Sequence, residues 1–133
     1  MPTTINEGAR AADWLKAEAG SYYSRGTGIV AAGSGVLLTG TVLAKVTATG
    51  KFVPAAASGA DGSQIAVAVL FSGADGKFTL DATSADKPAV IVERDAIASH
   101  AGLVYGATVN DAVKRAAANG QLKAVGILVR EGA

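Results

Sequence analysis

The sequence that decides the fold is G-T-V-L-A-K-V-T-A-T-G-K-F-V-P at residues 40–54, followed after a loop of small residues by D-G-S-Q-I-A-V-A-V-L at residues 61–70. Residues 41–47 alternate between two faces, which is the pattern of a β-strand. Pro54 lacks an N–H group, so it ends the next strand or confines it to an edge. Residues 65–71 are apolar on both faces, which is typical of a strand buried on both sides. The stretch therefore predicts a β-rich core.

Two explanations account for a strand with two apolar faces. Residues 65–71 are either a central strand of the core or a strand whose outer face a neighbouring subunit covers. In the second case the subunit interface would also include the apolar run at residues 89–92 and the charged pair that follows it. We therefore predict an interface formed by Ile65, Ala66, Val67, Ala68, Leu70, Arg94 and Asp95.

Composition limits the classes of protein to consider. The 133 residues fit a single domain, and its core must be aliphatic because half of the chain is apolar but only 5% is aromatic. A formal charge of +1 gives no electrostatic signal for nucleic acid or for an anionic membrane. The chain has no cysteine, and no apolar run reaches the length of a membrane span. We expect neither nucleic acid nor membrane as a partner.

The rest of the chain is predicted to be mainly β, with one short C-terminal helix. Apolar or alternating runs predict further strands at residues 28–32, 77–81, 89–92 and 122–130. Thr108 is predicted to cap a helix whose body is residues 112–118, and Asn119-Gly120 is predicted to end it.

Residues 1–28 differ from the domain predicted at residues 29–133. They are rich in alanine, glycine and charges of both signs, which favours a flexible arm. One face of a marginal helix could be formed by Ile5, Ala12, Leu15 and Ala19, with Gly20 ending it. Trp14 has two interpretations, since it either folds back on the core or anchors the arm on a partner.

No assembled catalytic site is evident. His100 is the only histidine and follows Ser99 in a loop, where a satisfied or solvated side chain is the expected state. The glycines of residues 25–35 do not match a phosphate-binding motif and are typical of turns. Arg94 and Asp95 are sequence neighbours on a predicted strand, so they would face opposite sides and contact different partners. We expect no cofactor, no metal and no enzymatic activity.

Several short motifs carry a family resemblance through their order and spacing. In the first part of the chain they are Glu7-Gly8, Glu18-Ala19-x-x-Tyr22 and Ser24-Arg25; in the rest they are residues 40–52, 61–64, 87–96 and 126–130. With these motifs the chain resembles the head decoration proteins of tailed bacteriophages, the family that includes the lambda-type decoration protein.

The resemblance implies a β-clip-like small barrel or sandwich that forms a homotrimer. Such a protein is made in the host cytoplasm and cements an expanded head at local threefold positions on the outer surface of the virion. Its partner is the major capsid protein, to whose strands the N-terminal arm would add. For this arm we predict shell contacts by Glu7, Trp14, Leu15, Tyr22, Tyr23, Ser24 and Arg25.

The alternative is a small β-barrel that binds a ligand or catalyses a reaction. It would use the loops at Asp61-Gly62 and Arg94-Asp95, and it requires several titratable groups in one concave pocket. A surface-binding module for carbohydrate is a weaker alternative, because Trp14, Tyr22, Tyr23 and Tyr105 are few aromatic residues for that purpose.

Overall fold

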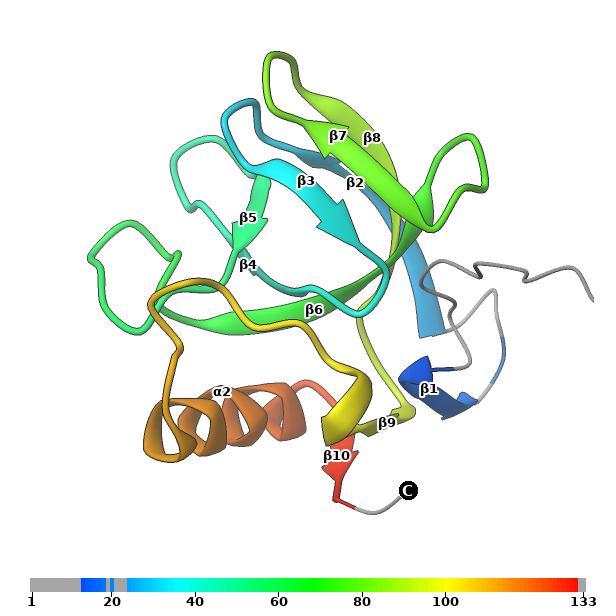
Figure 1. Ribbon diagram of the computed structural model, residues 1–133, viewed down its shortest axis with the longest axis vertical. Helices are drawn as coiled ribbons and strands as arrows, with labels where there is room; N and C mark the ends of the chain where they lie inside the picture. The colour runs from blue at the N-terminus through cyan, green and yellow to red at the C-terminus, as the bar shows by residue number, and fades with distance from the viewer. Residues whose placement is uncertain (1–12, 19, 21–23, 132–133) are drawn as a thin grey trace, which may run out of the picture.

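The computed structural model describes residues 13–18, 20 and 24–131 (Figure 1). A short 3₁₀ helix, His100–Gly102, follows β9. The strands and the helix are β1 (Leu15–Glu18), β2 (Arg25–Val30), β3 (Gly35–Leu38), β4 (Val42–Lys45), β5 (Phe52–Pro54), β6 (Ala66–Gly73), β7 (Thr79–Ala82), β8 (Lys87–Val92), β9 (Ala96–Ser99), α2 (Ala112–Ala124) and β10 (Ile127–Arg130). The prediction of a mainly β fold with one C-terminal helix is confirmed.

Five strands close into a barrel in the order β2-β5-β4-β6-β8. The pairs within it are antiparallel except for β2 with β5. Two smaller sheets complete the described part of the chain: the ribbon β3-β7, and the sheet β1-β9-β10. Figure 1 shows the ribbon in front of the barrel, with α2 and the second small sheet below β6.

Strands β4 and β6 separate two hydrophobic cores. The inner core fills the barrel beneath the β3-β7 ribbon and includes Leu43, and the outer core lies between the barrel and the layer of α2, β9 and β10 and includes Val42 and Ala44. Successive residues of β4 therefore enter different cores, as expected for side chains that alternate along a strand. The stretch predicted to form the core, residues 40–70, thus contributes side chains to both cores.

Burial of both faces of β6 within one chain explains its apolar pattern. Ala66 and Val69 belong to the outer core, whereas Ala68 and Leu70 belong to the inner core. All four are at most 1% exposed. This arrangement is the first of the two explanations given above. It corrects the predicted subunit contact for Ala66, Ala68 and Leu70, because no side-chain surface of these residues remains for a neighbour.

Residues near Trp14 form a strand where helical periodicity was expected. Strand β1 pairs antiparallel with β9, opposite Ala98 at Leu15. The predicted helix is therefore wrong at Leu15, while Ile5, Ala12 and Ala19 lie outside the described residues. Trp14 itself is fully buried in the outer core, and its indole N–H donates a hydrogen bond of 2.8 Å to Thr39 Oγ1. Trp14 thus folds back on the core.

The C-terminal helix is longer than predicted, and its N-cap is a different residue. Asp111 caps it by accepting a hydrogen bond from the Lys114 N–H, and the helix continues through Asn119 and Gly120 to Ala124. Burial of Ala118 and Leu122 supports the added turns. Gly126, at φ +88°, makes the turn into β10, so residues 122–125 are not strand as predicted.

Strands β3 and β9 were not predicted. Each has four residues, and β9 gains two partners that are distant in sequence, β1 and β10. Strand β3 is stabilised by antiparallel pairing with β7, with Leu37 opposite Leu80. Pairing with distant strands stabilises short segments whose own sequences show no clear strand pattern.

We predict that Ala68→Asp abolishes folding, whereas Ile65→Asp leaves it intact. The first change buries an unpaired charge in the inner core, and the cost is a large fraction of the ~5–15 kcal/mol that stabilises a typical domain. Ile65 is 47% exposed, so its change should alter the free energy of unfolding by only about 0.5 kcal/mol. Circular dichroism with urea titration measures both. A folded Ala68→Asp variant with unchanged stability would contradict the two-core arrangement.

Candidate functional site

A large apolar hollow lies beside β3 in the described part of the chain. We call it the β3 groove. It has a volume of about 540 Å³, and its walls are β3, the tip of the β2–β3 turn, the end of β5 and residues 104–107. None of its lining residues is charged. They are Ala32, Gly33, Ser34, Val36, Leu37, Leu38, Thr41, Val53, Pro54, Val104, Tyr105, Gly106 and Ala107.

The β3 groove collects exposed apolar side chains. Val36 is 60% exposed, Leu38 is 41% exposed and Val104 is 38% exposed. Val36 and Leu38 share one face of β3, while Leu37 between them enters the inner core. Apolar surface concentrated in one place is typical of a contact surface.

One edge of β3 carries main-chain groups that the described residues leave unpaired. Thr39 N–H donates to the Phe78 carbonyl, so Gly35, Leu37 and Thr39 point their main-chain groups toward β7. Val36 and Leu38 point theirs the opposite way. The Leu38 carbonyl accepts from Thr41, but the N–H and C=O of Val36 and the N–H of Leu38 have no hydrogen-bond partner in the described part of the chain.

Tyr105 fixes the groove wall opposite β3 to the helix. Its hydroxyl donates a 2.5 Å hydrogen bond to Asn119 Oδ1 of α2 and lies 2.9 Å from Nδ1 of His100. Burial raises the pKa of Tyr105, so its hydroxyl is protonated at neutral pH. His100 is therefore satisfied in a structural cluster, as expected for a loop histidine.

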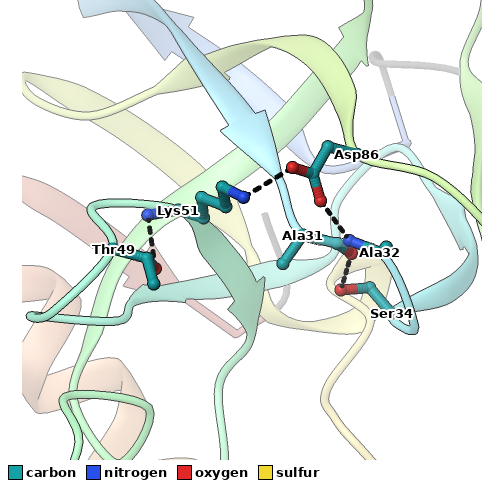
Figure 2. A network of polar contacts seen from close by, with 6 residues as sticks. All are labelled: Ala31, Ala32, Ser34, Thr49, Lys51 and Asp86. Atoms are coloured by element: carbon teal, nitrogen blue, oxygen red, sulfur yellow. Dashed lines mark hydrogen bonds and ion pairs between the residues drawn. The ribbon is translucent and has the colours of Figure 1, made fainter.

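A group of polar contacts around Asp86, which we call the latch, holds the β2–β3 turn at one end of the groove (Figure 2). Asp86 accepts hydrogen bonds from the Ala32 N–H at 2.8 Å and from Lys51 Nζ at 2.6 Å. Within the turn, Ser34 Oγ donates to the Ala31 carbonyl at 2.7 Å. The hydrogen bonds from Lys51 and Ala32 lower the pKa of Asp86, which keeps it ionised at neutral pH.

Part of the predicted subunit interface converges on a second hollow. Val67 and Arg94 line it together with Lys45, Phe52 and Glu93, and its volume is about 200 Å³. Arg94 forms an ion pair with Glu93 at 2.5 Å. Asp95 is exposed and has a φ of 48°, a conformation that reorients the chain between β8 and β9.

The described residues of the predicted arm bind to their own domain. Ser24 is fully buried and its hydroxyl donates to the Asp95 carbonyl at 3.1 Å. Arg25 forms a bidentate pair with Glu18 and lies 3.7 Å above the centre of the Phe71 ring. Leu15 packs against the outer core beside Trp14. Glu7, Tyr22 and Tyr23 lie outside the described residues.

The loops of the alternative enzymatic function contain structural interactions. Asp61 accepts hydrogen bonds from the N–H and the hydroxyl of Ser63, and these bonds lower the pKa of Asp61. Its role is that of a turn residue. Among the described residues there is no group of three or more His, Asp or Glu side chains placed to hold a metal ion. No helix in the same part of the chain is long and apolar enough to cross a membrane.

The sequence analysis missed Val36, Leu38 and Val104, which form the apolar surface of the β3 groove. The available signal was the run Val36-Leu37-Leu38 between two glycines, in which the outer two residues share one face. The glycines at residues 33 and 35 are typical of a turn, and here they lead directly into β3.

We predict that Asp86→Asn lowers stability at neutral pH and that the difference from the unchanged protein disappears in acid. Because the folded-state pKa of Asp86 is lowered, its contribution is present above the unfolded value and is lost as pH falls through the folded value. Melting temperatures measured from pH 7 to pH 2 should therefore converge. Lys51→Met should have a smaller effect of the same sign, because Ala32 still binds the carboxylate. A difference that stays constant with pH would contradict the latch.

Comparison with known proteins gives one match of nearly full length. A family model described as bacteriophage lambda head decoration protein D matches residues 4–127, which include every described strand except the end of β10. Comparison with curated proteins finds no match. The family is structural, and its members are parts of the phage capsid. Over this length the match shows that the chain belongs to the family of the bacteriophage lambda head decoration protein D.

Proposed function

We propose that this protein cements the phage head by trimerising at local threefold positions on the outer surface of the expanded shell. The observation that carries the proposal is the family match over residues 4–127. The described surface supports it, because its main hollow is apolar and uncharged and thus suited to contact with another protein.

We further propose that the arm that reaches the shell is residues 1–12, shorter than the 28 residues first predicted. Trp14 marks its root, since it is fully buried and hydrogen-bonded to Thr39. From β1 onward the described chain pairs with β9 and β8. In this proposal Trp14, Leu15, Ser24 and Arg25 hold the root of the arm, and the residues before them contact the shell.

The arm would stabilise the shell by adding a strand to it. Main-chain hydrogen bonds then supply affinity and offset the cost of ordering the arm. Three arms carried by one trimer act together, because each bound arm raises the effective concentration of the others. A trimer that joins several capsid subunits would have to lose all of these contacts before the shell could open.

We predict that a variant lacking residues 1–12 folds normally but binds expanded heads at least tenfold more weakly. The truncation leaves Trp14 and both cores in place, and it removes only the proposed shell contacts. A variant lacking residues 1–14 also loses the buried indole, which should cost ~3–5 kcal/mol of stability. Co-sedimentation with emptied, expanded heads measures binding, and thermal melting measures folding. Undiminished binding by the shorter truncation would contradict the proposed arm.

For the trimer we propose a contact through the hollow formed by Val67, Arg94 and their neighbours, flanked by Ile65. This part of the original interface remains accessible, since Ile65 is 47% exposed and Val67 and Arg94 line an open hollow. A threefold contact is heterologous, so a different patch of the next subunit would fill this hollow.

We predict that the protein sediments at three times its chain mass and that Ile65→Asp shifts it toward the monomer. An exposed apolar residue at an interface tolerates no charge without a partner. Val113→Asp is a matched control on α2, where the side chain is 79% exposed and lies outside the proposed contact. Analytical ultracentrifugation at micromolar concentration measures the mass of the sedimenting particle for each variant. A monomeric unchanged protein would refute trimerisation away from the shell.

A further inference from the structure

The free edge of β3 requires a partner with main-chain groups of its own. Val36 offers an unpaired N–H and C=O and Leu38 an unpaired N–H, and both side chains beside them are exposed and apolar. Natural edge strands usually carry charges or prolines that prevent pairing with another chain. Strand β3, with the sequence Gly-Val-Leu-Leu, has neither.

The β3 groove limits what this partner can be. Its volume of about 540 Å³ has room for a few apolar side chains, and the free main-chain edge beside it favours an extended segment. Its walls carry no charge, and a charged side chain placed there would lose hydration without gaining a partner. The occupant is therefore extended, uncharged and apolar on the side that faces Val104 and Tyr105.

We infer that the β3 groove binds an extended, uncharged segment of the shell protein, which adds to the free edge of β3 as a strand. The inference rests on the proposed function, since it names a second contact between this protein and the shell. Three main-chain groups at Val36 and Leu38 would pair with the added strand, and apolar side chains on alternate positions would enter the groove.

A second copy of this chain fits the edge less well. If two copies paired through their β3 edges, the contact would be isologous and would produce a twofold dimer, which a threefold trimer cannot contain. A segment of the shell protein is not subject to this restriction, and the cross-linking below separates it from a neighbouring copy that presents another of its edge strands, β1 or β10.

Contacts within the chain support both ends of the groove. The latch of Asp86 holds the β2–β3 turn at one end, and the hydroxyl of Tyr105 holds the opposite wall to α2. An acceptor of this kind loses little conformational entropy on binding, so more of the interaction energy appears as affinity. The rigid groove and the proposed arm are thus complementary, one accepting a strand and the other donating one.

Site-specific cross-linking on decorated heads tests the inference. The chain has no cysteine, so Val36→Cys creates a single site for a benzophenone maleimide, and Val113→Cys on α2 is the matched control. After binding to expanded heads and irradiation, we expect the label at residue 36 to join the major capsid protein at least fivefold more often than the label at residue 113. A link from residue 36 to another copy of this chain, or no link in a bound sample, would overturn the inference.

Head binding is measured on the same samples, so the two proposals can fail separately. If neither labelled variant binds, the proposed function is wrong and the inference is lost with it. If only the variant labelled at residue 36 fails to bind, the label blocks the groove and the inference is supported.

A main-chain substitution provides a second test. Val36→Pro removes an N–H that makes no hydrogen bond in the described chain, and proline is tolerated at a strand edge. We expect at least tenfold weaker binding to expanded heads for Val36→Pro than for Val36→Ala, with unchanged circular dichroism in both. Equal binding by the two folded variants would overturn strand addition; if Val36→Pro fails to fold, the cross-linking result decides.

Discussion

The burial of β4 and β6 on both faces is the constraint on which the rest of the structure depends. Strand β4 sends successive side chains to opposite cores, and β6 supplies residues to both, with a register shift between the pairs Ala44–Ala66 and Leu43–Ala68 that places Ala66 in the outer core and Ala68 in the inner core. The small side chains of Ala44, Ala66 and Ala68 are fully buried along these strands, which fits a fold in which layers approach closely. A chain that is half apolar and poor in aromatic residues thus fills two cores with aliphatic residues.

This arrangement also determines what remains on the surface. Because both faces of the most apolar strands are covered by the chain itself, exposed apolar side chains lie elsewhere in the described chain, and several of them gather on the outer face of the β3-β7 ribbon and beside it. Val36 and Leu38 of strand β3 are exposed there, beside an uncharged groove. A protein that acts by contact needs surfaces of this kind, while its titratable groups, such as Asp61 and Asp86, serve its own turns and loops.

The parts of the fold that could be predicted are those with a local pattern. Alternation in β4 and the continuous apolar run of β6 are properties of a few neighbouring residues, and they identified both strands. Strand β1 depends on β9, about 80 residues later in the chain, so its own residues gave only a weak helical pattern. The capping residue of α2 was missed for a similar reason, since Thr108 was a plausible cap but its hydroxyl instead accepts from Ala57.

The candidate site was harder to predict than the fold, because one sequence does not say which chain covers an apolar face. Ala68 and Leu70 have the pattern of an interface, and it is the inner core of the same chain that covers them. Trp14 presented the same ambiguity, and the outer core covers it. Val36 and Leu38 were missed because their exposure depends on the outer face of β3 being left uncovered while Leu37 enters the inner core, which is a property of the packed sheet.

The root of the proposed arm and the proposed strand acceptor are parts of one rigid unit. Gly40 lies so close to Trp14 that a Cβ there would be 2.8 Å from the indole ring, and its carbonyl accepts the N–H of Val104 in the groove wall. Gly102 is equally close to Asp13, because a Cβ added at Gly102 would lie 2.0 Å from the Asp13 carbonyl oxygen. Side chains at these two positions would force the root away from the groove. In this proposal, Trp14 and Gly40 therefore link the root of the arm to the wall of the β3 groove through a short path of packed backbone.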